Sequence, residues 1–307
     1  MKRFKKYLEE SVVATKRQPL EHLENMKPLA FLSLLKKIHE YGGKLHQGNT
    51  TIHEKIDGIP IRFGWDENGR FFLENSKSNP VYSGQAFVDF FASINKAHKG
   101  YAYAEIFDHF DKSKGMVNFI LSKHPKGVKF IAELLATGLA KYADDHHLTS
   151  MLVTYDRAKL GDMATFVLYD AVDPTTGERL EDYQELIRDF SSQFDSPEVK
   201  LTTSKLHFAE IDLGTVSVGS VVANYDEYTT VLQSRKAADK DAKVSLERLL
   251  DSMKDNLKNE ITAQFKDGHL FGLETEGHVV KVGDHEFKIT SDLHKERMRS
   301  KNPGFKL

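Results

Sequence analysis

The chain of 307 residues contains no cysteine. This absence excludes a disulfide framework, a disulfide-linked partner, a zinc site with thiolate ligands and catalysis by a cysteine nucleophile. A chain without thiols suits a reducing compartment, so we expect this protein in a cytoplasm.

Long apolar runs are also missing. No stretch of about 18 apolar residues occurs, so no segment is expected to cross a membrane. The basic cluster near the N-terminus ends at Lys6, and after two residues Glu9 and Glu10 interrupt any apolar run there. We therefore expect no secretory signal.

Neither sign of charge is in large excess. The chain has 43 Lys and Arg residues against 45 Asp and Glu residues, and its net charge is -2. Any contact with nucleic-acid phosphates must therefore come from local clusters. The densest cluster lies in residues 293–307 and contains Lys295, Arg297, Arg299, Lys301 and Lys306. This basic tail is either a binding platform or a solvated end of the chain.

Hydrophobic periodicity predicts a mixture of helices and strands. The first forty residues are typical of two helices, and helical spacing recurs near residues 86–99 and 237–265. Residues 50–55, 59–65, 70–74, 129–135 and 165–169 are typical of strands. Strands and helices do not alternate regularly, so we predict an α+β fold with antiparallel sheets flanked by helices.

Five short segments with charged residues follow one another in a particular order. Residues 54–58 read Glu-Lys-Ile-Asp-Gly, and residues 130–138 place Glu133 in an apolar strand. Residues 166–170 end in Tyr169 and an acid, residues 276–281 read Glu-Gly-His-Val-Val-Lys, and residues 286–289 contain Lys288. The first segment alone is a weak signal, because a lysine beside a hairpin turn is usually a surface charge. The ordered set is more specific.

In this order the segments resemble the signatures of the covalent nucleotidyltransferase superfamily, which comprises ATP-dependent DNA ligases, RNA ligases and mRNA capping enzymes. The glutamate directly before Lys55 is most similar to the type-two RNA ligases of bacteriophages. The resemblance covers roughly residues 50–290, with long unmatched stretches. It implies a ligase-type nucleotidyltransferase fold, ATP and Mg²⁺ as cofactors and, if a phage encodes the chain, a location in the host cytoplasm.

The chemistry of this superfamily is the attack of a lysine amine on the α-phosphorus of ATP, with pyrophosphate leaving. A lysine with its reference pKa of about 10.4 is protonated, so nearby positive charge or a divalent metal must activate it. The resemblance assigns the nucleophile to Lys55 and implies that Lys281 and Lys288 hold the α-phosphate. It also implies that Glu133 contacts the ribose or the metal, and that Glu276 serves the metal.

Further residues at the nucleotide are implied by the same resemblance: Glu54, Asp57, Gly58, Arg62, Lys77 and Tyr169, of which Tyr169 would stack on adenine. Arg62 and Lys77 are secondary candidates, because a solvated surface charge explains each equally well. Lys77 stands where the superfamily usually carries a basic residue that meets the 5′-phosphate of the substrate.

The last two segments form a predicted hairpin. A two-residue turn at 283–284 would place Lys281 and Lys288 diagonally on one face, close enough to hold one phosphate. Strict alternation would turn Glu276 to the other face, unless a bulge at Gly277 re-aims it.

Three departures from the superfamily pattern are visible. Ala132 replaces the glycine that usually precedes the strand acid, and Thr290 replaces the second lysine of the usual K-x-K in the last strand. The chain also ends 19 residues after Lys288, so we expect no C-terminal oligonucleotide-binding barrel.

The expected organisation has three parts: an N-terminal helical segment (1–48), a nucleotidyltransferase domain (49–292) with a helical insert (79–129) and a variable region (174–270), and a basic tail (293–307). The predicted function is an ATP-dependent RNA or DNA ligase that works through lysyl-AMP on nicked or single-stranded 5′-phosphate ends. One alternative is transfer of NMP to another acceptor, such as an RNA 5′ end or a protein. A second is a non-catalytic binding module of the same fold, which the retention of the charged set disfavours.

Overall fold

The computed structural model describes most of the chain: residues 20–56, 58–75, 80–93, 104, 107–108, 110, 114–135, 164–194, 196, 199–214, 218–265, 270 and 275–301. Several predictions lie outside these residues. They are the first helix, Asp57, Lys77, the last residues of the tail, and parts of the 79–129 insert and of the 174–270 region.

The described residues divide into two compact units. The five-stranded unit holds those of Ile56–Ser204, and the three-stranded unit holds those of Pro19–Lys55, Lys205–Leu270 and Glu274–Leu307. The boundary falls directly after Lys55. The domain bounds expected from the sequence remain a prediction.

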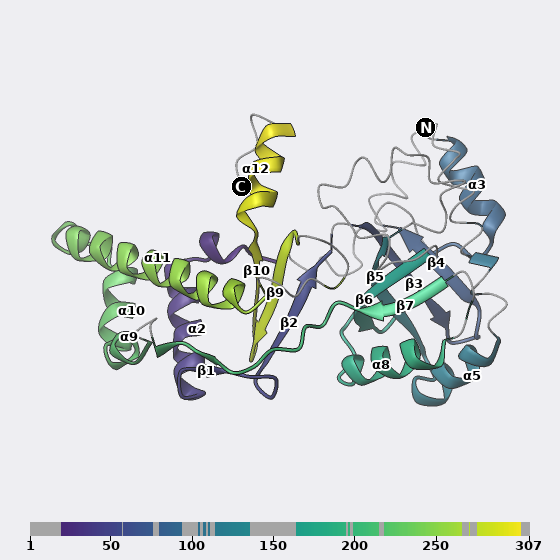
Figure 1. The fold of residues 1–307 in the computed structure, drawn as a ribbon, viewed down its shortest axis with the longest axis horizontal. Coiled ribbons are helices and arrows are strands. Elements are labelled where there is room, and N and C mark those ends of the chain that lie inside the picture. The colour runs from purple at the N-terminus through teal and green to yellow at the C-terminus, as the bar shows by residue number, and fades with distance from the viewer. Residues whose placement is uncertain are drawn as a thin grey trace. The chain divides into compact units, whose positions relative to one another are not determined.

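The five-stranded unit is a mixed sheet in the order β4-β3-β5-β6-β7 (Figure 1). The strands are β3 (Ile59–Asp66), β4 (Phe71–Asn75), β5 (Gly127–Leu135), β6 (Ala164–Val172) and β7 (Val199–Thr203). All neighbours are antiparallel except β6 and β7. The helices are α3 (Gly84–Ser93), α5 (Lys114–Lys123) and α8 (Tyr183–Gln193).

One face of this sheet is covered by an aromatic core. Alternate residues of β3 and β5, such as Phe63 and Phe130, are fully buried there. Phe190 of α8 stacks on Phe130 with ring centroids 4.5 Å apart, and Ile120 of α5 belongs to the same core. Because side chains alternate along a strand, the polar residues between these core positions lie on the other face of the sheet.

The three-stranded unit contains the antiparallel sheet β10-β9-β2 and a small pair, β1-β8. The strands are β1 (Lys44–Leu45), β2 (Thr50–Lys55), β8 (Ile211–Asp212), β9 (Gly277–Val282) and β10 (His285–Thr290). The helices are η2 (Leu23–Asn25), α2 (Pro28–Glu40), α9 (Val218–Ala223), α10 (Tyr225–Gln233), η4 (Ala237–Asp239), α11 (Lys240–Ala263) and α12 (Asp292–Lys301).

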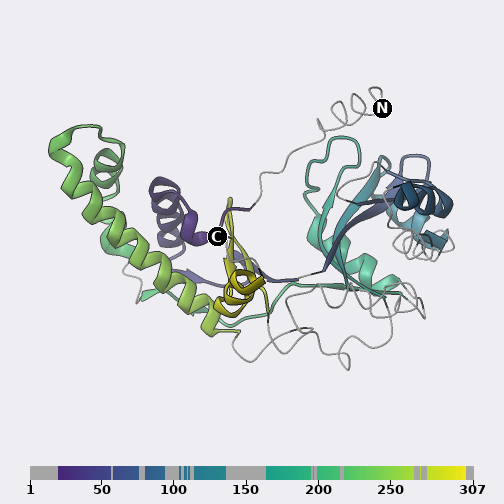
Figure 2. The ribbon, with the colours of Figure 1, turned by 90° about the horizontal axis from the view of Figure 1, so that it is seen from above.

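Helices cover one face of the three-stranded sheet. The apolar stripe of α11, with Leu250 and Leu257, packs in one core with α2 and with sheet residues such as Ile52, Val280 and Phe287. Figure 2 shows α11 running alongside α10 and α2. The other face of the sheet is therefore left for polar side chains.

The α+β class predicted from the sequence is confirmed. The predicted strands and the long helix are present with ends shifted by a few residues, and the helix predicted at 86–99 is described as α3 up to Ser93. Part of the basic tail is helical, as α12. Within the described residues, no helix combines the length and hydrophobicity that a membrane span requires.

Candidate active site

The three predicted catalytic lysines share one face of the sheet β10-β9-β2. Antiparallel pairing aligns the side chains of this face in rows across the three strands. The rows are Thr51–Lys281–Glu286, His53–Val279–Lys288 and Lys55–Gly277–Thr290. We call these nine residues the lysine face.

The hairpin of β9 and β10 has the register that the sequence predicts. Val282 pairs with His285 across the turn, and Val279 pairs with Lys288. Lys281 and Lys288 are therefore diagonal neighbours on the lysine face. Two cations in this arrangement can bind oxygens of a single phosphate group.

Glu276 contacts the predicted nucleophile. Its Oε1 forms an ion pair with Lys55 Nζ, and the two side chains are 13 % and 26 % exposed. Glu276 can reach Lys55 because it lies just before β9 and is not bound by strand alternation. The next residue, Gly277, has φ +149°, and a Cβ there would overlap the Ile289 carbonyl oxygen. The glycine of the E-G-x-V-x-K segment is thus required by the backbone.

The charges on the lysine face affect one another. Burial lowers the pKa of Lys288, and the positive charge of Lys55 lowers it further, while the carboxylate of Glu276 opposes this change. The face therefore concentrates positive charge in a partly dehydrated setting, which favours a polyanionic ligand.

Glu54 lies on the opposite side of β2 from Lys55. Its carboxylate is 3 % exposed and accepts a hydrogen bond of 2.7 Å from the backbone N–H of Leu270. In register it faces His278, whose ring centroid lies 5.0 Å from that of Phe265. Glu54 therefore links β2 to the backbone at Leu270 on the face opposite Lys55. Its contact with a nucleotide remains a prediction.

Gly58 lies against the strand that carries Glu133. A Cβ at this position would come within 3.0 Å of the Leu134 carbonyl oxygen and 3.1 Å of Glu133 Cβ. The glycine of the K-x-D-G segment therefore allows the chain to pass close to β5, next to the predicted nucleotide-binding glutamate.

Arg62 belongs to a small charged network. Its Nη1 donates to Glu74 Oε1 at 2.8 Å, and Lys129 Nζ donates to Glu74 Oε2 at 3.3 Å. Lys129 and Glu133 lie on the partly exposed face of β5, opposite the aromatic core. Sequence analysis did not single out Lys129, because one lysine between apolar residues of a strand carries no spacing signal.

Tyr169 lies at a β-bulge in β6. The register shifts there, so that Ile131 pairs with Asp170 while Ala132 pairs with Leu168. Asp170 is 1 % exposed and accepts two hydrogen bonds from Arg179, at 2.9 and 3.0 Å. This buried ion pair, also missed by sequence analysis, fixes the strand directly after Tyr169.

The predicted site residues are thus found in two groups. Lys55, Glu276, Lys281 and Lys288 belong to the three-stranded unit, and Arg62, Glu133 and Tyr169 to the five-stranded unit. No cluster of three or more His, Asp or Glu side chains able to hold a metal occurs in the described part of the chain. The two predicted metal ligands, Glu133 and Glu276, belong to different units, so a shared metal remains a prediction.

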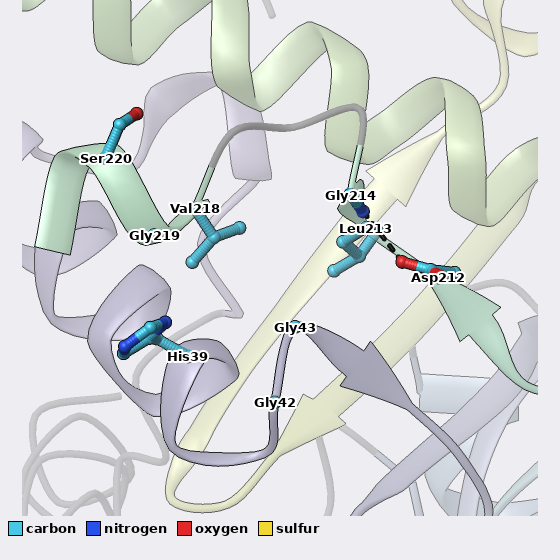
Figure 3. Close-up of a pocket in the computed structure, with 9 residues that line it drawn as sticks. All are labelled: His39, Gly42, Gly43, Asp212, Leu213, Gly214, Val218, Gly219 and Ser220. Carbon is cyan, nitrogen blue, oxygen red and sulfur yellow. Dashed lines mark hydrogen bonds between the residues drawn. The ribbon is translucent and has the colours of Figure 1, made fainter.

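A cavity of about 440 Å³ opens elsewhere in the three-stranded unit (Figure 3). It lies between the C-terminal end of α2 at His39 and the start of α9 at Val218 and Ser220. Asp212 accepts a hydrogen bond from the Gly214 N–H at its edge. Its lining includes none of the predicted site residues.

Comparisons with known proteins give structural likeness but no sequence match. No protein-family model matches the chain, and no curated protein matches its sequence. A lysine mutant of the Naegleria gruberi RNA ligase, solved with ATP and Mn, is similar with a TM-score of 0.44 and 12 % identity, over 93 % of this chain and 58 % of that one. An apo aspartate mutant of the same ligase is similar with a TM-score of 0.42 and 13 % identity, over 94 % of this chain and 59 % of that one.

A further structure with the name Pmar-Lig_Pre. gives a TM-score of 0.30 and 10 % identity, over 83 % of this chain and 45 % of that one. The chain thus spans less than two thirds of the length of each of these structures. The evidence for its chemistry therefore comes from its own residues.

Proposed function

We propose that the chain is an ATP-dependent polynucleotide ligase that acts through a lysyl-AMP intermediate at Lys55. The observation that carries this proposal is the ion pair of Lys55 with Glu276 at one end of a face that also holds Lys281 and Lys288. An ordinary surface lysine is not expected to lie beside a partly buried carboxylate on a face with two further lysines.

In the first step the Nζ atom of Lys55 forms a bond to the α-phosphorus of ATP, and the bond from that phosphorus to the pyrophosphate oxygen breaks. The carboxylate of Glu276 is in contact with Nζ and is placed to receive its proton. Lys281 and Lys288 hold the α-phosphate oxygens, where positive charge stabilises the transition state most.

The charge of the lysine face fits a triphosphate with a divalent ion. Three lysines against two carboxylates, Glu286 on the face and Glu276 beside it, leave a net positive charge. Mg²⁺ typically takes one or two carboxylates together with phosphates and water. Mg²⁺, when bound, would neutralise phosphate charge during the transfer. The resemblance to nucleotidyltransferases further implies that Glu133, Arg62 and Tyr169 of the five-stranded unit contribute to nucleotide binding, and this contribution is part of the proposal.

The later steps need a nucleic-acid substrate. AMP would move from Lys55 to a 5′-phosphate, and a 3′-hydroxyl would then displace AMP to close the strand. The substrate in this proposal is a nicked or single-stranded 5′-phosphate end of RNA or DNA.

Incubation with labelled ATP and Mg²⁺, with and without a nicked duplex, tests the proposal by denaturing electrophoresis. We expect label on the protein in both cases, and joined strands when the duplex is present. Lys55→Ala should abolish both signals, whereas Lys240→Ala, which alters an exposed lysine at the start of α11, should change neither.

Labelled protein without joined strands on any RNA or DNA nick would instead support NMP transfer to another acceptor. The replacement of the second lysine in the last strand by Thr290 is the observation that keeps this alternative in view. Equal labelling of wild type and Lys55→Ala would reject both functions.

A further inference from the structure

The row of the lysine face that contains the nucleophile ends in Thr290. Lys55, Gly277 and Thr290 align across the three strands, so Thr290 occupies the place nearest the nucleophile on β10. Its side chain is 2 % exposed, and its Oγ1 lies 3.1 Å from Nδ1 of His22. An imidazole therefore covers the position where the resemblance leads one to expect a second lysine.

The backbone holds His22 firmly in this place. The N–H of Lys288 donates to the carbonyl oxygen of Glu21 at 3.0 Å, and His22 forms a parallel bridge with Lys288 at the free edge of β10. The next residue, Leu23, is 1 % exposed and belongs to the core of the three-stranded unit. The backbone at His22 is thus held on both sides by contacts that do not involve a ligand.

Charged groups surround the ring. Burial lowers the pKa of His22, and the positive charges of Lys288, Lys295 and Lys55 lower it further, while Glu24 acts against them. These effects place the imidazole within electrostatic range of both the nucleophile and Lys288, and they keep it neutral near pH 7.

A neutral imidazole carries one proton, and its position decides what the ring can bind. When the Thr290 hydroxyl donates to Nδ1, the proton lies on Nε2. The contact with Thr290 uses Nδ1 and not Nε2. The ring is only partly buried, so an incoming ligand can reach it.

We infer that His22 is a nucleotide-binding residue, whose Nε2–H donates a hydrogen bond to a phosphate oxygen of the nucleoside triphosphate bound at Lys55. This inference rests on the proposed function, because it takes the lysine face as the triphosphate site. His22 and Thr290 together then supply a neutral donor in the row of the nucleophile, beside the cations Lys281 and Lys288.

Two amide substitutions separate this role from a purely structural one. Asn places a polar atom near the position of Nδ1 and can keep the bond to Thr290, but it has nothing at the position of Nε2. Gln reaches the position of Nε2 with an N–H donor. If Nε2 contacts the ligand, His22→Gln should keep ATP binding and His22→Asn should lose it. If His22 acts only through its hydrogen bond with Thr290, His22→Asn should keep ATP binding and His22→Gln should lose it.

The experiment has two readouts. Equilibrium binding of ATP with Mg²⁺ is measured by calorimetry in the Lys55→Ala background, where no covalent step can occur. The rate of AMP-adduct formation is measured with Lys55 intact. We expect His22→Asn to weaken ATP binding and slow adduct formation roughly 10- to 100-fold, the range for a hydrogen bond to a charged group. His22→Gln should stay within a few fold of wild type, and His39→Asn, at an exposed histidine in the same unit, should have no effect.

ATP binding by His22→Asn that equals that of the Lys55→Ala parent would overturn the inference. Equal loss in the Asn and Gln variants, with lowered thermal stability in both, would also overturn it and leave His22 a structural residue. A Lys55-containing protein that binds ATP through His22 but forms no adduct would instead contradict the proposed function alone.

Discussion

Gly277 has a backbone conformation that other residues rarely adopt, and it directly follows the carboxylate that meets the nucleophile. Its φ of +149° and the closeness of the Ile289 carbonyl leave no room for a side chain. Single residues of this kind decide whether Lys55 and Glu276 can meet, so the sharpest mutational tests lie at the residue scale.

Gly277→Ala should lower the free energy of unfolding by about 1–3 kcal/mol from the strained φ alone. The clash of the new Cβ with the neighbouring strand should add to this loss. Thermal unfolding should show a clear drop in midpoint. Gly115→Ala is the control, since a Cβ at that exposed helical position meets nothing within 4 Å. A Gly277→Ala protein as stable as wild type would show that this backbone conformation is not required.

Glu276→Ala should slow formation of the AMP adduct roughly 100- to 1,000-fold, the range for loss of one preorganised charged group at a reacting centre. The variant should fold normally, because the change removes a carboxylate and little core volume. Glu133→Ala is expected to behave likewise if it holds the ribose or the metal. Glu227→Ala, at an exposed glutamate of α10, is the control for both. Adduct formation at the wild-type rate in both variants would place the metal site elsewhere.

His53 makes a separate prediction about pH. Burial, together with the positive charge of Lys205, lowers its pKa to about 4. Between pH 6.5 and 4 the unfolded chain therefore takes up a proton that the folded protein refuses, and stability falls as the pH falls through this window. The full effect below pH 4 is roughly 3 kcal/mol, from the size of the shift.

The variant His53→Gln cannot titrate, so its unfolding free energy should depend less steeply on pH between 6.5 and 4, by about this amount. Denaturant unfolding at several pH values measures the difference, with His39→Gln as the exposed control. Identical pH dependence in wild type and His53→Gln would refute the lowered pKa.

At the scale of elements, sequence patterns predict some parts of the fold well. The hairpin of β9 and β10 was predictable to the exact register, because a Gly-Asp turn joins two strands of clear alternation. The helix α11 was predictable because its apolar stripe, from Leu246 to Ile261, repeats over about four turns. Residues 174–235 were not resolved from the sequence. Within them β7, β8 and α9 are each only two to six residues long, too short for any periodicity to show.

The diagonal placement of Lys281 and Lys288 was predictable because a motif and a short turn fix their spacing. The contact of Glu276 with Lys55 was not, since strict alternation would have turned Glu276 to the other face. The catalytic roles of these residues remain predictions. Contacts between distant segments were not predictable. His22 reaches Thr290 across 268 positions of the sequence, and no local pattern marks such a pair. Alternation along the predicted strand places Glu54 opposite Lys55. Its partner there, the backbone N–H of Leu270, lies 216 positions away and carries no local signal.

The helix α12 offers a test of the basic tail. His294 is buried, and its Nε2 lies 3.5 Å from Glu276 Oε1, so deletion of the tail would also disturb the site. Substitution of Arg297 and Arg299 by Ala is a cleaner change. If these cations bind nucleic-acid phosphates, the double variant should keep adduct formation and lose affinity for a nicked duplex. The slope of log affinity against log salt should flatten by about 1–2, from the loss of up to two phosphate contacts.

Binding measured across a salt series tests this prediction. The matched control replaces Arg235 and Lys236, two exposed cations that precede η4 in the same unit. Unchanged affinity and salt dependence in the α12 variant would mean that the tail is a solvated end of the chain and that another surface binds the substrate.

At the scale of the whole molecule, the predicted site residues are divided between the two units, and the boundary between the units in the sequence falls directly after the predicted nucleophile. Lys55 is the last residue of β2 in the three-stranded unit, and Ile56 begins the main segment of the five-stranded unit. The net charge of -2 gives the molecule no general affinity for polyanions. The proposed chemistry on ATP therefore depends on the local concentration of cations around Lys55.

Intact mass spectrometry after incubation with ATP and Mg²⁺, followed by peptide mapping, tests this account most directly. The account predicts one AMP adduct, located on Lys55, and no adduct in Lys55→Ala. An adduct of equal yield in Lys55→Ala, or one mapped to a different residue in the wild-type protein, would contradict it.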